Sequence, residues 1–169
     1  AVDSDWDQLV ANPSSPLVNR ATQGLYQPGT ALQSVVVAEL VLSGLSTLDT
    51  QVVSATVPVI IDSTTLSCSR GDLKEQTLAE AYGASCPFPF IRASRLLRAN
   101  GLADAVARWH LTSPVRIAIP TDSSNWDSAN LTTTFSLELE AIGQGGLTVS
   151  PLRMAAVAGT LANNGIMPP

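Results

Sequence analysis

The chain has 169 residues, of which 45% are hydrophobic and 14% charged, with a formal net charge of −5. This composition excludes a disordered chain and suits a single globular domain over residues 1–169 with a buried core. No run of lysine or arginine is present, which argues against a nucleic-acid partner, and no segment reaches the roughly 18 uncharged apolar residues that a membrane span needs.

The first expected element is a helix over residues 30–42. The preceding residues 1–29 are rich in turn formers and are expected to be irregular. In the sequence "YQPGTALQSVVVAEL" a Pro-Gly turn leads into Thr30, a good N-cap residue, and then into a long apolar stretch. The apolar residues surround most of the axis, which is typical of a central helix that packs on several sides.

A short strand and a second helix are expected next. Residues 52–63 ("VVSATVPVIIDS") are rich in β-branched residues, and Pro58 would limit them to the edge of a sheet. Asp72 and Glu75 have the spacing of a capping box. This pair predicts a helix that runs to about Tyr82 and stops at the glycine that follows.

The second half of the chain predicts three helices and one short strand. Residues 90–111 have a helical pattern with a stop signal at residues 100–101, which divides them into two helices. Residues 115–120 ("VRIAIP") form a candidate strand. Ser150 is a good N-cap for a last helix that begins at the next proline and closes at an Asn-Asn-Gly sequence. The fold class expected from the whole pattern is mainly α (α+β), with little sheet.

The chain contains two cysteines, Cys68 and Cys86. From the residues alone, two separate buried thiols and a disulfide are both open, and a disulfide would imply an oxidising compartment. Together with the single histidine, His110, the cysteines supply too few ligands at the wrong spacing for a metal site. We therefore expect no metal and no cofactor.

Three segments resemble the transpeptidase domain of penicillin-binding proteins. "NRATQGLYQPGTALQ" (19–33) is similar to the approach to that family's active-site helix, where Tyr-x-Pro-Gly precedes Ser-x-x-Lys. "TLAEAYGASCPFPF" (77–90) is similar to its second motif, with Ser-Cys-Asn before an aromatic residue. Residues 141–169 are similar to its Gly-Gln-Gly segment, which Thr-Pro-Leu-Gln-Met-Ala follows. One such match would be weak, but three in the family's order and spacing, over about residues 15–169, are specific.

The resemblance implies a chemistry whose groups are mostly replaced here. In the family a serine at the helix start attacks an acyl carbonyl, and a lysine one turn later takes its proton. The position of the serine is held by Thr30 and that of the lysine by Gln33, which cannot hold a proton at neutral pH. In the second motif Ser85 and Cys86 match, but Pro87 stands at the asparagine position. The third motif, Lys-Thr/Ser-Gly, would come after residue 169.

The expected function follows from these replacements. The resemblance implies a transpeptidase-like domain linked to peptidoglycan synthesis, and the losses at Gln33 and Pro87 favour a pseudoenzyme that acts as a scaffold or interaction module. The alternative is a weak acyl-transfer enzyme or β-lactam acceptor that uses Thr30 as its nucleophile. A purely structural role of Thr30 as an N-cap would explain that residue without catalysis. A third alternative is that segments outside this chain complete the site.

The resemblance also implies a location and a set of partners. It places the domain on the outer face of the cytoplasmic membrane, as part of a longer envelope protein that contacts the membrane only through segments outside this chain. Proteins of cell-wall synthesis or division are the expected partners, with a peptidoglycan stem peptide or a β-lactam as a weak ligand. Because disulfides persist outside the cytoplasm, we expect a bond between Cys68 and Cys86, with two separate thiols as the alternative.

Overall fold

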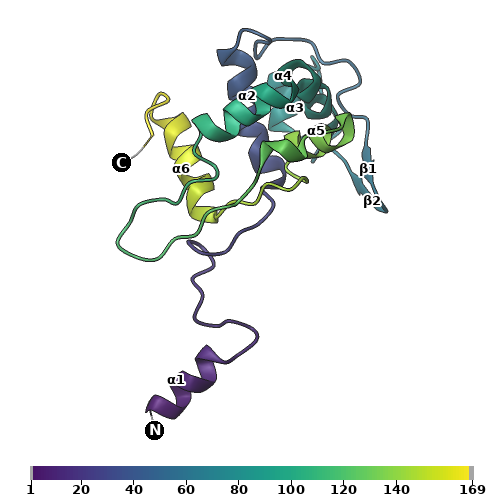
Figure 1. Ribbon diagram of the computed structural model, residues 1–169. Helices are drawn as coiled ribbons and strands as arrows, with labels where there is room; N and C mark the ends of the chain where they lie inside the picture. Colours follow the sequence, from purple (N-terminus) through teal and green to yellow (C-terminus); the bar gives the residue numbers. More distant parts are fainter. Residues whose placement is uncertain (1, 168–169) are drawn as a thin grey trace.

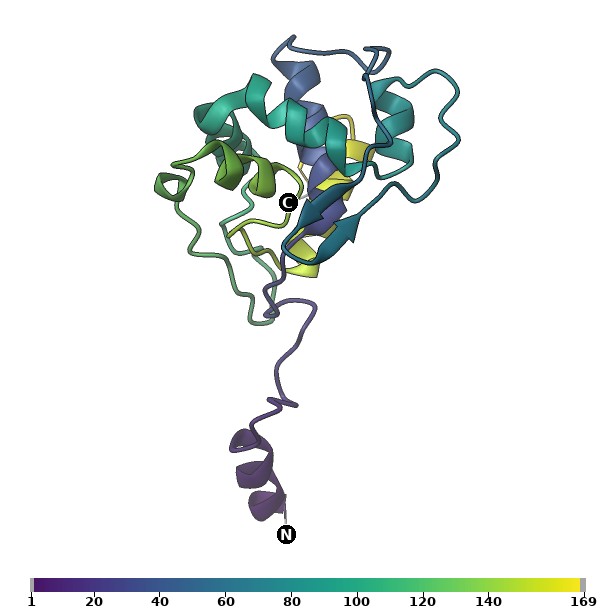
Figure 2. The same cartoon turned by 90° about the vertical axis from the view of Figure 1, so that its right-hand side faces the viewer.

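The computed structural model describes residues 2–167, with side chains from residue 5 onward. Figures 1 and 2 show α2 in the middle of a group of helices, while α1 lies apart at the end of an extended segment. The long helix α4 packs against both α2 and α5. The mainly α fold with little sheet is therefore confirmed. In chain order the elements are α1 (Val2–Val10), the 3-10 helix η1 (Gly29–Leu32), α2 (Gln33–Leu42), β1 (Val59–Ile61), β2 (Thr64–Leu66), α3 (Leu78–Gly83), α4 (Pro87–Arg108), the 3-10 helix η2 (Ser128–Asn130), α5 (Thr134–Ala141) and α6 (Pro151–Ala162).

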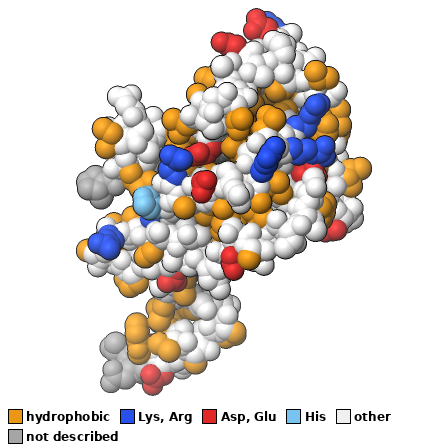
Figure 3. Space-filling model, turned by 45° about the horizontal axis from the view of Figure 1, so that its top comes forward, with side chains coloured by type: hydrophobic (Ala, Val, Ile, Leu, Met, Phe, Trp, Pro, Cys, Tyr) orange, Lys and Arg blue, Asp and Glu red, His pale blue; other side chains and the backbone are white. Residues whose placement is uncertain are grey.

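Helix α2 is the central helix that the sequence predicts. Val35, Val36 and Leu40 are completely or almost completely buried, because their side chains meet α4 and the rest of the core. The last turn leaves the core: the exposed fractions are 43% for Val41 and 68% for Leu42. Burial on most sides therefore holds for the first two turns of the helix only. Hydrophobic atoms also reach the surface at many points on the face drawn in Figure 3.

The start of this helix differs from the prediction. Pro28, not Thr30, occupies the N-cap position of η1, and no side chain caps that turn. Gly29 has a φ of +55°, a conformation that glycine adopts without steric cost, and the helical turn begins there. Thr30 therefore lies exposed inside the first turn, and its predicted role as an N-cap is wrong.

A buried carboxylate joins α2 to the end of α4. Glu39 is buried, and its Oε1 accepts a hydrogen bond from Trp109 Nε1 and forms an ion pair with Arg108 Nε, both at 3.0 Å. Burial of a carboxylate is costly unless it is paired, and here both a cation and a neutral donor pair it. This contact holds the middle of α2 against the end of α4.

The predicted strand is shorter than its β-branched sequence. β1 begins at Val59, directly after Pro58, because proline has no N–H to give to a sheet. It pairs antiparallel with β2, which the sequence analysis missed, in the register Val59↔Leu66. Asp62, in the turn between the strands, has a φ of +51°. The hairpin is the only sheet among residues 2–167.

The N-cap of helix α3 lies five residues after Asp72, the N-cap of the capping box that the sequence predicts with Glu75. Its N-cap is Thr77, whose Oγ1 accepts a hydrogen bond from the Glu80 backbone N–H at 3.2 Å. The same S/T-x-x-E pattern thus occurs further along the chain. The residues directly before Thr77 are not helical, and Gln76 has a φ of +49°. The predicted end of the helix at Tyr82 and the next glycine is confirmed.

The Glu80 carboxylate organises the loop before α3 and makes it sensitive to acid. Its oxygens accept hydrogen bonds from the backbone N–H groups of Lys74, Glu75 and Gln76. The N–H of Glu75 is the main cause that lowers the pKa of this carboxyl below its ordinary value of 4.5. Because the folded pKa is depressed, this stabilisation is present above pH about 4.5 and is lost as the pH falls through the folded pKa.

We expect amide hydrogen exchange to show this loss. After correction for intrinsic rates, protection of the Glu75 and Gln76 amides should fall between pH about 6 and about 3, because protonation removes the charged acceptor. In the Glu80→Gln variant the same amides should exchange quickly at both pH values. Unchanged protection in the unmodified protein at low pH would contradict this assignment.

Helix α4 contains the predicted break, but at a different residue. The sequence predicts the division at residues 100–101, whereas the non-helical residue is Arg98, with φ 60° and ψ 175°. Gly101 instead lies inside the second part, where a Cβ would only touch the Leu97 side chain at 3.4 Å. The first part begins at Pro87, which is tolerated at the first helical position because its missing N–H would have no partner there.

The remaining elements divide into predicted and missed ones. α6 has the predicted N-cap: Ser150 Oγ accepts a hydrogen bond from the Arg153 backbone N–H at 3.2 Å. Residues 115–120 form no strand, and that prediction is wrong. α5 was not predicted, although Thr133 and Ser136 form a capping box at its start. The expectation that residues 1–29 are irregular is wrong for α1. This segment contains no proline or glycine that would interrupt a helix. None of the helices within residues 2–167 has the length and apolarity to cross a membrane.

Candidate active site

The start of the central helix rests on the glycine-rich segment far along the chain. The Gly29 N–H donates a hydrogen bond to the Gly143 carbonyl at 2.9 Å. Gln27 Nε2 donates to the carbonyls of Gln144 and Gly145, at 3.2 and 2.8 Å. The "GQGG" sequence therefore supports the turn that presents Thr30.

The glycine-rich segment is itself held by a buried carboxylate that the sequence analysis did not single out. Glu140 Oε2 accepts hydrogen bonds from Trp126 Nε1 and from the Gly146 N–H, both at 3.0 Å, and Oε1 accepts from the Leu147 N–H at 2.9 Å. Glu140 is buried, at the end of α5. Its position in "SLELEAIGQGG" resembles no motif, so only the three-dimensional structure identifies it.

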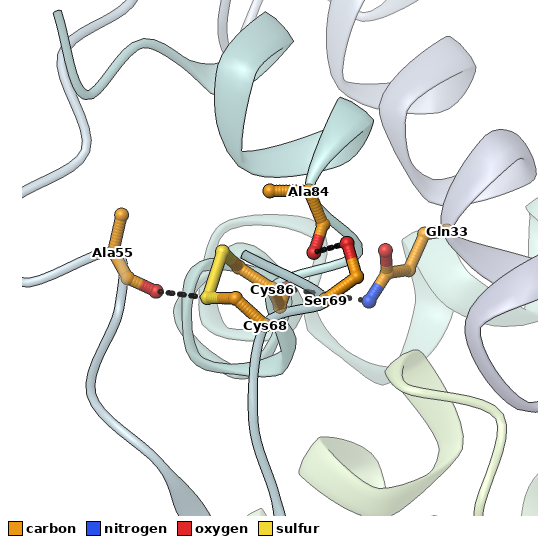
Figure 4. The surroundings of a disulfide bond; sticks show 6 residues. All are labelled: Gln33, Ala55, Cys68, Ser69, Ala84 and Cys86. Carbon is orange, nitrogen blue, oxygen red and sulfur yellow. Dashed lines mark hydrogen bonds between the residues drawn. A yellow bond between two sulfur atoms is a disulfide. The ribbon is translucent and has the colours of Figure 1, made fainter. Parts of the chain in front are cut away.

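Gln33, at the position of the family's lysine, points to the second motif. It is buried in the first turn of α2, and its Nε2 donates a hydrogen bond to the Cys86 carbonyl at 3.3 Å, as Figure 4 shows. An amide can make this contact but cannot accept and hold a proton at neutral pH. The structure therefore brings together Gln33 and the Cys86 segment. Thr30 precedes Gln33 by three residues, the spacing of neighbours on one helix face.

The second motif forms the junction between α3 and α4. Ser85 is half-buried with a φ of +51°, and its N–H donates to the Tyr82 carbonyl at 2.9 Å. Cys86 is the N-cap of α4, and the fully buried Pro87 is its first residue. Pro87 thus starts a helix and carries no amide that could hold a substrate. A further contact, Ser34 Oγ with Tyr82 Oη at 3.0 Å, joins α2 to α3 and was not expected.

Among the described residues, no lysine or histidine follows Thr30 by one turn. The single lysine of the sequence, Lys74, lies in the exposed loop before α3 and does not follow Thr30 by one turn. The single histidine, His110, lies just beyond the end of α4. Within residues 2–167 no three His, Cys, Asp or Glu side chains gather where a metal ion could bind.

A disulfide also holds the second motif, through the side chain of Cys86. Cys68 and Cys86 are bonded, with an S–S distance of 2.08 Å and a Cα–Cα distance of 4.0 Å. Next to it, Ser69 Oγ and the Ser69 N–H both donate to the Ala84 carbonyl, at 2.9 and 2.7 Å (Figure 4). The residues around Cys68 are thereby tied to the end of α3, while Cys86 presents its carbonyl to Gln33.

We expect thiol titration of the denatured, unreduced protein to find no free thiol, and two per chain after reduction. Reduction should lower the free energy of unfolding by about 3 kcal/mol, because the bond closes a loop with a sequence separation of 18. The Cys68→Ser/Cys86→Ser variant is the control and should no longer respond to the reductant. Two thiols per chain before reduction would rule the bond out.

Comparison with known proteins points in the same direction as this geometry. The family model described as penicillin binding protein transpeptidase domain matches residues 1–169. The peptidoglycan D,D-transpeptidase PbpA of Mycobacterium tuberculosis (strain CDC 1551 / Oshkosh) is 28% identical over 165 residues, which cover 95% of this chain and 33% of that protein. PbpA of Mycolicibacterium smegmatis is 30% identical over 168 residues, with the same shares. The chain thus spans about a third of the length of the curated relatives it matches.

Solved structures agree with the sequence comparisons. The crystal structure of PBPA from Mycobacterium tuberculosis has a TM-score of 0.80 at 29% identity, over 98% of this chain and 38% of that one. A ceftriaxone acyl-enzyme complex of the same protein has a TM-score of 0.78 at 28% identity, with the same coverage. The D,D-transpeptidase domain of a peptidoglycan glycosyltransferase from Eggerthella lenta shares the fold, with a TM-score of 0.81 at 23% identity, over 98% and 44% of the two chains. Because the family model matches residues 1–169, this chain belongs to the penicillin-binding protein transpeptidase domain family.

Proposed function

We propose that this chain is a transpeptidase-like domain linked to peptidoglycan synthesis that has lost acyl transfer and serves as a scaffold or interaction module. The observation that carries the proposal is the buried Gln33, whose amide donates to the Cys86 carbonyl at 3.3 Å. A side-chain amide is not basic at neutral pH and cannot take a proton from Thr30. Loss of a general base alone costs about 10²–10⁴-fold in rate.

Two further features support the loss of activity. Thr30 carries a methyl group beside its hydroxyl, which crowds attack on a carbonyl carbon. Pro87 offers neither a side-chain amide nor an N–H for a substrate amide, and it is fully buried at the start of α4. The nucleophile, the base and the substrate-binding asparagine are thus all replaced.

The second candidate function is weak acyl transfer or β-lactam acceptance through Thr30. It is favoured by one observation: Thr30 is exposed on a helix turn that the contact between Gly29 and Gly143 holds in place. The related PBPA of Mycobacterium tuberculosis forms acyl-enzyme complexes with ceftriaxone and imipenem. A geometry that presents a hydroxyl therefore persists in this chain, although the base does not.

Intact-mass measurement after incubation with a fluorescent penicillin separates the two functions. The protein in its natural length is used, with PBPA of Mycobacterium tuberculosis as the positive control. No adduct should form under conditions in which the control is fully labelled. An adduct that disappears in the Thr30→Ala variant would overturn the proposal and establish the enzyme.

We expect the Thr30→Ser/Gln33→Lys variant to remain without useful acylation. The double substitution restores the residue types of the family's nucleophile and base. Pro87 is unchanged, however, and residue 33 is only 1% exposed. A lysine there is desolvated and has the Cys86 carbonyl, not a carboxylate, beside it. Labelling by penicillin is measured alongside Gln33→Lys alone. Stoichiometric labelling of the double variant would show that these two positions suffice for activity.

We further propose that residues 1–169 form a single domain of a longer envelope protein on the outer face of the cytoplasmic membrane. Its partners would be proteins of cell-wall synthesis or division, and a peptidoglycan stem peptide would be a weak ligand. The disulfide between Cys68 and Cys86 supports an oxidising location. Fusion of a reporter that is active only outside the cytoplasm to the natural-length protein tests the location: an inactive reporter on a stably expressed fusion would contradict it.

A further inference from the structure

An arginine in the first turn of α6 is buried with no counter-charge among residues 5–167. The exposed fraction of Arg153 is only 6%. Its Nη2 donates to the Ser113 carbonyl at 2.8 Å, and its Nη1 contacts the Met167 sulfur at 3.7 Å. Its Nε has no hydrogen-bond partner among the described residues. The guanidinium thus has one good acceptor, the Ser113 carbonyl, and no anionic partner among residues 5–167.

Such an arrangement is costly in a folded protein. Buried charged groups are normally paired, and a buried donor left without a partner loses its hydration without compensation. Burial lowers the pKa of Arg153 below its ordinary value, yet an arginine stays charged at neutral pH. The ion pairs found within residues 5–167 use other arginines, Arg95 with Glu138 and Arg108 with Glu39. No carboxylate within residues 5–167 forms an ion pair with Arg153.

The arginine lines a cavity whose chemistry matches an anion. The cavity has a volume of about 480 Å³, and Arg116 and His110 line it together with Arg153. No Asp or Glu belongs to its lining. Arg116 and His110 are exposed at its surface, whereas Arg153 is buried. Two cations and an imidazole that can donate a hydrogen bond therefore share one cavity, from the end of α4, the loop after it and α6.

We propose that this cavity binds a small oxyanion of the carboxylate or phosphate class, with Arg153 as its buried anchor and Arg116 as a second contact. The guanidinium fork can donate to two oxygens of one oxyanion, which fits planar carboxylates and phosphates. The cavity lies beside α6 and involves neither Thr30 nor Gln33. The proposal is therefore independent of whether the chain transfers acyl groups.

The positive charge at residue 153 distinguishes this chain from the family pattern. The segment that starts α6 here reads Ser-Pro-Leu-Arg-Met-Ala, where the family pattern is Thr-Pro-Leu-Gln-Met-Ala. Arg153 thus stands where the pattern has a neutral amide. The substitution Arg153→Gln restores the pattern's residue and removes the charge, which makes it a suitable test variant.

The experiment titrates the natural-length protein with inorganic phosphate and, separately, with acetate, at constant ionic strength set with sodium chloride. Binding is followed by the Nε–H resonance of Arg153 in a ¹H–¹⁵N spectrum and by the melting temperature. We expect a saturable shift of this resonance and a rise in melting temperature with at least one of the two anions. Arg153→Gln should weaken binding by about tenfold or more, which corresponds to about 1.4 kcal/mol.

Two further variants keep the test decisive. Arg116→Ala changes an exposed residue and should weaken binding several-fold without unfolding the protein, so it serves if Arg153→Gln does not fold. Arg92→Gln removes an exposed arginine that lines a different cavity and should leave binding unchanged. The relative response to phosphate and acetate identifies the class of anion. The absence of saturable binding by either anion, as when another part of the protein supplies the carboxylate, would overturn the proposal. Equal binding by the unmodified protein and both Arg153→Gln and Arg116→Ala would overturn it too.

Discussion

Replacement of Gly143 by alanine is expected to lower the free energy of unfolding by about 4 kcal/mol and to displace the turn that presents Thr30. A Cβ at residue 143 would lie 2.5 Å from the Gly29 nitrogen and closer still to the Gly29 carbonyl oxygen. Both are backbone atoms, so no side chain can move aside. Gly143 also has a φ of +70°, which costs an alanine further energy. Strain and overpacking each cost about 1–3 kcal/mol.

The matched control is Gly83→Ala. Gly83 is the last residue of α3, its φ is not positive, and a Cβ there would meet nothing within 4 Å. We expect this variant to be neutral or more stable by up to about 1 kcal/mol, since it reduces the freedom of the unfolded chain. Chemical denaturation measures both variants. A loss of less than about 1 kcal/mol for Gly143→Ala would mean that the glycine-rich segment does not rest on Gly29.

Truncation of Glu140 to alanine is expected to lower the free energy of unfolding by about 4 kcal/mol. The carboxylate accepts three hydrogen bonds, from Trp126 Nε1 and from the N–H groups of Gly146 and Leu147. Without it these donors stay partly or fully buried with no partner, and each costs about 1–3 kcal/mol. The fluorescence of Trp126 should also change, because its indole loses its acceptor.

Glu138→Ala, two residues earlier on α5, is the control for this prediction. Glu138 pairs with Arg95 at 2.6 Å, but the Arg95 side chain is 63% exposed. An ion pair of this kind contributes at most about 1 kcal/mol. Chemical denaturation of the two variants should therefore separate them by about 3 kcal/mol. Equal losses would show that Glu140 contributes no more than a surface charge.

Local contacts explain why some elements could be predicted from the sequence. The start of α6 depends on Ser150, whose Oγ accepts from an N–H three residues away, and on the proline that follows it. The end of α3 at a glycine and the start of β1 after Pro58 likewise depend on single residues at the boundary. Such signals act within one helical turn and are written in a few adjacent residues. The family was likewise recognisable, because its three segments keep their order along the chain.

Where several local signals compete, packing selects among them. Both Asp72–Glu75 and Thr77–Glu80 have the spacing of a capping box, and only the second begins a helix. Gln51 pairs with Thr77 and Gln76 has a positive φ, so the helix begins only after these residues. In the same way the stop signal at residues 100–101 was correct in kind, but the chain bends at Arg98.

The sequence by itself determined that the chain is mainly helical and that it resembles this family, and it predicts that Thr30, Gln33 and Pro87 stand at the positions of the family's reactive groups. Only the tertiary structure decided what these three residues contact. The contact from Gln33 to the Cys86 carbonyl joins residues 53 positions apart, and the contact from Gly29 to Gly143 is longer still. The burial of Arg153 with no carboxylate partner among residues 5–167 is equally invisible in the sequence. The physical reason is that burial and hydrogen-bond partners between distant segments depend on how whole helices pack, which no short pattern encodes.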